Sequence, residues 1–228
     1  VACWDYADLA DMLDWDALND FRRKSLNPEH PAQRGTAQNP DVFFQAKEAS
    51  NKAYDAIPEV VEEYMNKVNE KIGSDYKLFN YYGAEDADEV IIAMGSVCDT
   101  ISETVDYLNA NGRKVGLVKV RLYRPFSVKH LVAAIPSTVK KISVLDRTKE
   151  PGSIGEPLYL DVVAALRDTE FANVPVYTGR YGLGSKDTTP AQIIAVFKNT
   201  EKKRFTIGIN DDVTNLSLAL DENPDTTP

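Results

Sequence analysis

From about residue 88 onward, short apolar runs alternate with segments whose apolar positions recur every three or four residues. The runs are rich in β-branched residues, which is typical of strands buried on both faces of a parallel sheet. The pattern predicts five strands, within residues 90–94, 115–120, 142–145, 174–177 and 205–209.

The segments between these runs predict amphipathic helices with recognisable ends. The first carries its apolar face over residues 97–108 and stops before Gly112, a good C-terminal stop. The second begins at Ser127, a preferred N-cap, and ends before Pro136. A third helix is expected over residues 159–166, which place Tyr159, Val162, Val163 and Leu166 on its apolar face.

The fourth helix has the clearest start in the chain. Thr189 stands at the N-cap position, Pro190 at the first helical position and Gln192 at the third, which together form a capping box. Strands and helices that alternate with short connections predict helices on both faces of a sheet. Residues 86–212 are therefore expected to form an open, mostly parallel, five-stranded α/β sheet.

The first 85 residues show a different pattern, helical with polar connectors. Apolar positions at helical spacing from Ile57 to Ile72 predict one long amphipathic helix that ends at Gly73. Another helix is expected over residues 40–53, with Phe43, Phe44 and Ala46 packing inward. We find no internal repeat and no low-complexity tract.

Composition narrows the classes of function. A net charge of -9 and a pI near 4.8 argue against binding to a nucleic-acid backbone, which relies on clustered Lys and Arg. No apolar run approaches the ~20 residues of a membrane span, and no signal peptide is visible. Two cysteines, Cys3 and Cys98, are too few for a disulfide framework, a four-thiolate zinc site or an iron–sulfur cluster within the chain.

The segment between residues 178 and 187 is the richest candidate site, since it follows a strand and precedes the capped helix. Glycine amides and two cations can hold an anion, and the candidate residues are Arg180, Gly182, Gly184, Ser185 and Lys186. The order Ser185-Lys186 reverses the phosphate-loop order, and no third glycine completes a dinucleotide fingerprint. A structural turn or a domain contact is therefore the favoured interpretation, and no residue is assigned a catalytic or metal-binding role.

The turn after the first of the five strands carries a single glycine, Gly95, where a dinucleotide fold needs a triad. Ser96 is expected to cap the following helix. Cys98 then lies in the first helical turn, where the helix dipole can lower a thiol pKa, although a buried and unreactive thiol is the favoured interpretation.

Charged residues follow two further strands. Arg121 and Arg124 end one strand, and the segment 146–152 ends the next with charges of both signs. Ion pairs with another domain are favoured over chemistry at both places. The two histidines, His30 and His130, have no serine or cysteine partner at a spacing typical of nucleophilic catalysis.

Several of these stretches together resemble pyruvate:ferredoxin (flavodoxin) oxidoreductase. They occur in the right order along nearly the whole chain, at residues 27–31, 34–40, 93–98, 118–126, 144–152 and 179–187. In that family a single long polypeptide decarboxylates pyruvate on thiamine diphosphate with Mg. It passes electrons through [4Fe–4S] clusters to ferredoxin or flavodoxin and makes acetyl-CoA from coenzyme A.

The resemblance implies an internal segment that covers the end of the first domain and the second domain, whose fold is similar to the transketolase C-terminal domain. The expected organisation is a remnant of the preceding domain with a linker (1–40), a helical connector (41–85), the α/β domain (86–212) and an acidic linker to a following domain (213–228). No cofactor or catalytic residue is expected in the segment, which alone should be inactive. Its partners would be the other domains of a parent enzyme, which is expected to be a dimer.

Two alternatives stay open at this point. One is a free-standing module that binds coenzyme A or a nucleotide through the loop 179–186, and the other is a subunit of a split 2-oxoacid oxidoreductase. The expected location is the cytoplasm, or a hydrogenosome-like organelle in an anaerobic eukaryote. The electron acceptor, the 2-oxoacid and the oligomeric state cannot be read from these residues.

Overall fold

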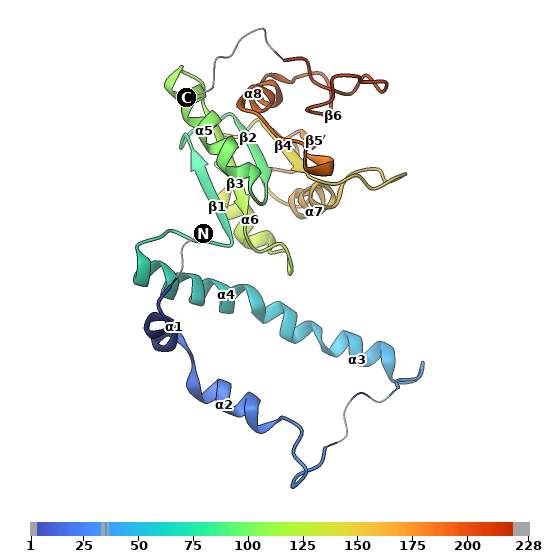
Figure 1. Cartoon of the computed structure of the whole chain (residues 1–228). Coiled ribbons are helices and arrows are strands. Elements are labelled where there is room, and N and C mark those ends of the chain that lie inside the picture. The colour runs from blue at the N-terminus through green and yellow to red at the C-terminus, as the bar shows by residue number, and fades with distance from the viewer. Residues whose placement is uncertain (1–3, 33–34, 36, 221–228) are drawn as a thin grey trace. The chain divides into compact units, whose positions relative to one another are not determined.

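The computed structural model describes residues 4–32, 35 and 37–220 (Figure 1). The chain divides into two compact units, residues 1–76 and 77–228. Within the described residues, no helix combines the length and the apolar character that crossing a lipid bilayer requires.

The first unit is helical. Its elements are α1 (Tyr6–Met12), α2 (Trp15–Arg23), α3 (Phe43–Ala49) and α4 (Asn51–Ile72). The predicted end of the long helix is confirmed, because Gly73 closes α4 in the left-handed conformation with φ 68°. The helix predicted over residues 40–53 is wrong in extent, since Ser50 both ends α3 and precedes α4.

The inward packing expected for this region is also wrong. Phe43, Phe44 and Ala46 are exposed, and the Phe44 side chain is 73% exposed. Among the described residues of the first unit, only Pro58 is buried. Helical periodicity predicts an apolar face on α4, but Val60, Tyr64 and Ile72 on that helix are exposed.

The second unit is built on one sheet with strand order β1-β3-β2-β4-β5-β6. The strands are β1 (Phe79–Gly83), β2 (Glu89–Ala93), β3 (Val115–Val120), β4 (Lys141–Asp146), β5 (Val176–Arg180) and β6 (Arg204–Thr206). Strands β2 to β6 are parallel to their neighbours, and β1 lies antiparallel to β3 at one edge. The mostly parallel fold is thus confirmed with six strands rather than five.

The additional strand β1 was missed because it is short and half polar. It includes Asn80, Tyr81 and Tyr82, and its burial falls from fully buried at Phe79 to exposed at Gly83. An edge strand needs only one hydrogen-bonded neighbour and does not require a continuous apolar run. The α/β unit therefore begins before the expected start at residue 86.

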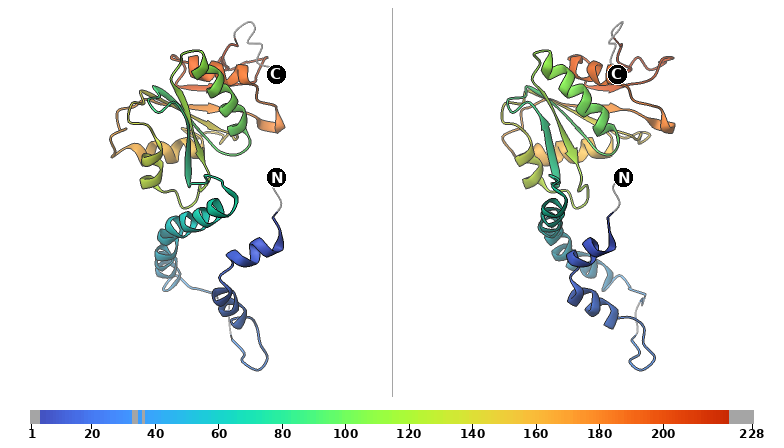
Figure 2. Two further views of the ribbon diagram at one scale, coloured as in Figure 1. Left: turned by 90° about the vertical axis from the view of Figure 1, so that its left-hand side faces the viewer. Right: turned by 60° about the vertical axis from the view of Figure 1, so that its left-hand side comes forward.

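Four helices cover the sheet, two on each face (Figures 1 and 2). They are α5 (Val97–Ala110), α6 (Val128–Ala134), α7 (Pro157–Leu166) and α8 (Pro190–Lys198), with a short 3₁₀ turn, η1 (Leu183–Ser185). Helices α5 and α8 pack together with the strands around one core cluster that includes Ile101, Ile193 and Phe205. Helices α6 and α7 lie on the opposite face. The capping box at Thr189 is confirmed, with both of its hydrogen bonds present.

Two strand positions differ from those predicted. Strand β5 runs from Val176 to Arg180 rather than from residue 174, because Pro175 has no N–H to donate and contributes only its carbonyl, which accepts from Ile142 N at 3.0 Å. Strand β6 stops at Thr206, shortly before Gly208 turns the chain with φ 86°.

The segment after β6 returns to the sheet. Ser217 forms a β-bridge with Thr206, and Leu218 packs against the core. Residues 213–220 are therefore part of the second unit rather than the linker expected over 213–228. Residues 221–228 lie outside the described residues.

Candidate functional site

The carboxyl ends of the parallel strands meet at one edge of the sheet, where ligands bind in open α/β folds. Asp146 ends β4 and Arg180 ends β5, and these two residues are register partners in the sheet. Thr206 ends β6 and pairs with Arg180. The topology therefore gathers three polar side chains that are far apart in the sequence.

Asp146 caps helix α7. Its carboxylate oxygens accept hydrogen bonds from the backbone N–H groups of Leu158 at 2.9 Å and Tyr159 at 3.2 Å. Only 3% of Asp146 is exposed, and this burial raises the pKa of its carboxyl group above the usual value. Asp146 thus holds the start of α7 in place and is committed to a structural role.

Arg180 is held by Glu156, the N-cap residue of α7. Its Nη1 lies 3.2 Å from Glu156 Oε1, and the Glu156 side chain is 4% exposed. The second carboxylate oxygen, Oε2, accepts from the backbone N–H of Glu150 at 2.7 Å. This ion pair fixes the Arg180 guanidinium at the edge of the sheet and neutralises part of its charge.

The glycine-rich loop after β5 contains three positions with a left-handed backbone conformation, which favours glycine and strains a side chain. Gly182, Gly184 and Ser185 have φ values of 65°, 64° and 61°. The carbonyl of Gly182 accepts a hydrogen bond from Arg147 Nε at 2.9 Å, and a Cβ at Gly182 would lie 3.1 Å from that nitrogen. Gly182 is therefore required both for its conformation and for the close approach of Arg147.

A pocket of about 190 Å³ opens beside this loop. Residues from three loops line it: Lys149, Arg180, Tyr181, Gly182, Leu183, Lys186, Thr206, Ile207, Gly208, Ile209 and Thr214. Three of the five residues predicted for an anion site line this pocket, namely Arg180, Gly182 and Lys186. Gly184 and Ser185 lie in the same loop but do not line it.

The charged segments after β3 and β4 find partners within the second unit. Arg121 Nε donates to Asn80 Oδ1 at 2.9 Å, and Arg124 Nη2 donates to Asp161 Oδ2 at 2.7 Å. These bonds attach the loop to β1 and α7 of the same unit. In the segment 146–152, Asp146 and Arg147 do not form an ion pair with each other. Asp146 accepts from a backbone N–H of α7, and Arg147 donates to the carbonyl of Gly182.

Cys98 is a buried thiol on α5. Burial raises its pKa to about 11, and the lowering effect of the Lys119 and Arg121 charges is smaller. The favoured interpretation from the sequence is confirmed, and a thiolate stabilised by the helix dipole is not. Ser96 precedes α5 but its side chain makes no capping hydrogen bond. Cys3 lies outside the described residues.

His130 has a partner that sequence reasoning missed. Its Nδ1 lies 2.6 Å from Ser127 Oγ, in the first turn of α6. Ser127 is the N-cap residue of α6 as predicted, but its side chain makes no hydrogen bond to the helix backbone and lies against His130 instead. His30 lies in a turn in which its N–H donates to the carbonyl of Asn27 at 3.0 Å.

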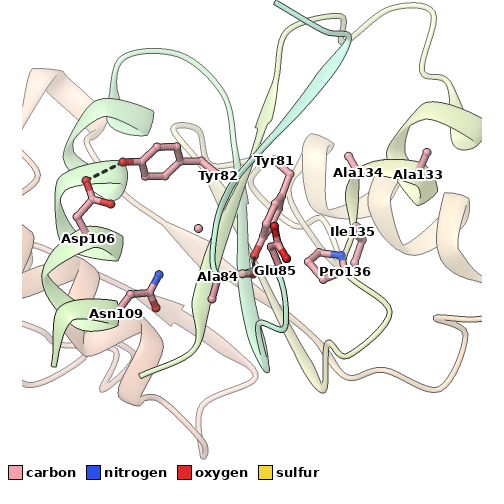
Figure 3. Close-up of a pocket in the computed structure, with 11 residues that line it drawn as sticks. Tyr81, Tyr82, Ala84, Glu85, Asp106, Asn109, Ala133, Ala134, Ile135 and Pro136 are labelled. Atoms are coloured by element: carbon pink, nitrogen blue, oxygen red, sulfur yellow. Dashed lines mark hydrogen bonds between the residues drawn. The ribbon is translucent and has the colours of Figure 1, made fainter. Parts of the chain in front are cut away.

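A wider depression of about 690 Å³ lies along β1, and its lining residues include Tyr81, Tyr82, Asp106, Asn109 and Pro136 (Figure 3). Tyr82 Oη donates to Asp106 Oδ2 at 2.6 Å, and this bond is the main cause that raises the pKa of Tyr82 to about 12. The two tyrosines point to opposite sides of the strand, toward α5 and toward the end of α6. The hydroxyl groups are committed to hydrogen bonds, with Tyr81 Oη donating to the carbonyl of Ala84.

A search of the described residues for three or more metal-ligating side chains close together finds no such group. This result agrees with the scarcity of histidine and cysteine in the chain.

Comparison with known protein families finds two matches. Residues 87–193 match the model of pyruvate:ferredoxin oxidoreductase core domain II. Residues 1–66 match the thiamine diphosphate-binding model of pyruvate flavodoxin/ferredoxin oxidoreductase. The two matched ranges lie largely in the two different units of the structure.

Whole proteins give the same result. The chain is 58% identical over 222 residues to a pyruvate-flavodoxin oxidoreductase of Enterobacter agglomerans, covering 96% of this chain and 19% of the relative. It is 54% identical over 228 residues to a pyruvate:ferredoxin oxidoreductase of Moorella thermoacetica, covering 98% of this chain and 19% of the relative. The chain thus spans about a fifth of the length of the curated relatives it matches.

Among solved structures, a 2-oxoglutarate:ferredoxin oxidoreductase of Magnetococcus marinus matches with a TM-score of 0.40 and 23% identity. The match covers 61% of this chain and 22% of that chain.

Proposed function

This chain belongs to the pyruvate:ferredoxin (flavodoxin) oxidoreductase family, and from this premise we propose that it is a structural segment of such an enzyme. The parent enzyme would oxidatively decarboxylate pyruvate with coenzyme A to acetyl-CoA and CO2 and reduce ferredoxin or flavodoxin. The segment would carry none of the catalytic groups and would hold neighbouring domains in position.

The contrast between the two units carries this proposal. The second unit buries apolar residues on both faces of its sheet, whereas Pro58 is the one buried residue among those described in the first unit. Large apolar side chains there stay in solvent, including Tyr6 (90%), Phe21 (73%) and Phe44 (73%). Burying a side chain of this kind contributes ~1.5–3 kcal/mol, so the first unit gains most by packing against further parts of a longer polypeptide.

The polar groups of the second unit support a structural role. Asp146 accepts a hydrogen bond from the start of α7, and Arg180 is paired with Glu156, the N-cap residue of the same helix. Arg124 is paired with Asp161. A catalytic acid or base needs a free route to substrate, and these groups are committed to helix ends and loops. The chemistry is therefore assigned to other parts of the parent enzyme.

The cofactors of the family do not fit the described residues. A diphosphate bound through Mg²⁺ requires a cluster of oxygen ligands, and a [4Fe–4S] cluster requires several cysteine thiolates. The described residues hold no cluster of three metal-ligating side chains, and the chain has two cysteines in all. We derive no catalytic step for this chain through thiamine diphosphate or iron–sulfur clusters.

The wider setting is part of the same proposal. The relatives are named for flavodoxin or ferredoxin, so a parent enzyme of this segment would use one of these proteins as its electron acceptor. We place that enzyme in the cytoplasm, as a dimer whose domains contact this segment.

The test is a segment exchange. In the Enterobacter agglomerans relative, the 222 aligned residues would be replaced by those of this chain. The chimera should retain coenzyme A-dependent reduction of a viologen dye by pyruvate within about tenfold of the parent. A matched chimera that carries Leu117→Asp, a fully buried position of β3, should lose the activity with its fold.

The purified 228-residue chain should show no pyruvate-dependent reduction under the same conditions, with thiamine diphosphate, Mg²⁺ and coenzyme A present. Turnover by the chain alone would overturn the structural assignment. The chimera that keeps Leu117 would also contradict it if it folded but were inactive. The replaced segment of the relative would then supply something that this chain lacks.

A further inference from the structure

The pocket beside the loop after β5 has an unusual charge for this protein. Its lining includes Lys149, Arg180 and Lys186 and contains no Asp or Glu. The chain as a whole has 35 acidic and 26 basic residues, for a net charge of -9. A concave, purely cationic lining on an acidic protein attracts small anions and concentrates them locally.

The three cations come from two loops and are held differently. Arg180 is fixed by Glu156 at 3.2 Å, and its side chain is 14% exposed. Lys149 and Lys186 are exposed, and neither has an ion-pair partner among the described residues. The pocket therefore combines one oriented guanidinium with two ammonium groups that are available to a ligand.

A buried hydroxyl at the floor of the lining also lacks a partner. Thr206 lines the pocket and is 6% exposed, and its Oγ1 has no hydrogen-bond partner among the described residues. A buried polar atom without a partner is unfavourable, and Thr206 is the lining residue that carries one. The neighbouring Thr214 hydroxyl bonds instead to Asp212 at 2.6 Å.

Two glycines line the pocket, one in each of the loops after β5 and β6. Gly182 and Gly208 line it with φ values of 65° and 86°. Both positions have a backbone conformation that favours glycine. These positions lie in the loops after β5 and β6, at the carboxyl edge where open α/β sheets bind ligands.

Size and charge select the class of ligand. A volume of about 190 Å³ holds roughly six waters, which is below the ~300 Å³ of a pocket for a drug-sized molecule. Lys149 and Lys186 together carry two unpaired positive charges, and a phosphate group carries about −1.5 to −2 at pH 7. A monocarboxylate offers half that charge and fewer acceptor oxygens.

We propose that this pocket binds a phosphate group through Lys149, Lys186, Arg180 and the Thr206 hydroxyl, either as free phosphate or as the end of a phosphorylated metabolite. The site goes beyond the structural role proposed above and does not depend on it. The site combines the glycine-rich loop predicted from the sequence with residues of the segments that follow β4 and β6.

The experiment is a titration of the whole 228-residue chain with inorganic phosphate at low ionic strength, followed by amide chemical shifts in ¹⁵N spectra. We expect saturable shifts at Gly182, Gly208 and their neighbours, with a Kd on the order of 1 mM. Lys149→Ala and Lys186→Ala should each weaken binding about tenfold, and Thr206→Val about threefold. Lys203→Ala, at the opposite end of β6, removes the same charge and should change the Kd less than twofold.

Three ligands distinguish the sources of the phosphate group. AMP that binds at least tenfold more tightly than phosphate, with shifts at the same amides, identifies a phosphorylated metabolite. Equal affinities identify free phosphate, and acetate should bind at least tenfold more weakly than either. The proposal is overturned if phosphate gives no saturable shifts, if acetate binds as tightly, or if the Lys149 and Lys186 variants bind like the Lys203 variant while remaining folded.

Discussion

Glu89 and Lys141 are register partners at the starts of β2 and β4, and Lys141 Nζ lies 2.7 Å from Glu89 Oε2. The same ammonium donates to the carbonyls of Phe197 at 2.8 Å and Asn199 at 2.9 Å, at the end of α8. One lysine, whose side chain is 10% exposed, therefore connects two neighbouring strands to a helix end. Cations at a helix C-terminus are further favoured by the helix dipole.

Lys141→Met should lower the free energy of unfolding by about 3 kcal/mol, because it removes the buried charge paired with Glu89 and leaves two carbonyls without their donor. Urea unfolding of the whole chain measures this change. Lys140→Met is the matched control, since Lys140 is 77% exposed in its pair with Asp88 and should contribute less than about 1 kcal/mol. Equal effects of the two substitutions would show that the buried lysine is not a tertiary anchor.

Asp146 should make the stability of the second unit depend on pH. Burial raises the pKa of its carboxyl group in the folded state. The stability gained from the tighter binding of this proton is therefore fully present below the unfolded pKa of ~3.9. It is lost as the pH rises through the folded pKa. Relative to Asp146→Asn, the wild-type chain should therefore lose stability as the pH rises above about 4.

Urea midpoints of both proteins across this range test the prediction, with Asp168→Asn, an exposed site beyond α7, as the control. A difference between wild type and Asp146→Asn that stays constant with pH would contradict it.

Cys98 should react slowly with thiol reagents. Burial raises its pKa from 9.0 to about 11, so the thiolate fraction at pH 8 falls about a hundredfold, and access to the thiol is also restricted. In a Cys3→Ser variant, the labelling rate should rise at least a hundredfold when the chain is unfolded in urea. A native rate close to that of a free cysteine would mean that α5 opens far more often than its packing allows.

Glu156→Gln should strengthen phosphate binding while weakening the fold. The carboxylate neutralises Arg180, so its removal leaves a third uncompensated charge beside the pocket. We expect about threefold tighter binding in the same titration, together with an unfolding free energy lower by about 2 kcal/mol. Asp161→Asn, which loosens Arg124 away from the pocket, should leave the phosphate affinity unchanged. Weaker binding in Glu156→Gln would indicate that orientation of Arg180 matters more than its charge.

The two units should differ in independent stability. Residues 77–228 contain the sheet and its core and should unfold cooperatively, with a midpoint within a few degrees of that of the whole chain. Residues 1–76 expressed alone should show partial helicity and a broad, non-cooperative thermal melt, since one described residue is buried there. Circular dichroism distinguishes these outcomes, and a sharp melt of residues 1–76 would contradict the proposed need for a partner.

The sequence predicted the most apolar parallel strands well, as in β2 (Glu89–Ala93), where four buried apolar residues follow one another. It also located the capping box at Thr189, which is a local pattern. It missed β1, a short edge strand without a continuous apolar run. It also overestimated the packing of Phe43 and Phe44, because periodicity indicates an apolar face without indicating what covers it.

The candidate site shows the same division between local and tertiary information. Gly182 and Lys186 were visible as a glycine-rich loop after a strand, but Lys149 and Thr206 join them only through the strand order. The pairing of Arg180 with Glu156 likewise depends on how α7 packs beside β5. No spacing rule links residues that approach one another through tertiary packing.

The return of residues 216–218 to β6 has a consequence for self-association. Thr206 N–H donates to Leu216 O at 3.0 Å, and Leu218 N–H donates to Thr206 O at 2.9 Å. The outward N–H and carbonyl of Thr206 are thereby occupied by the chain's own backbone, which leaves less of this edge for an incoming strand to pair with. In the described part of the chain, growth of the sheet by addition of a foreign strand is thus directed to β1, and misassembled copies would be expected to join through that edge.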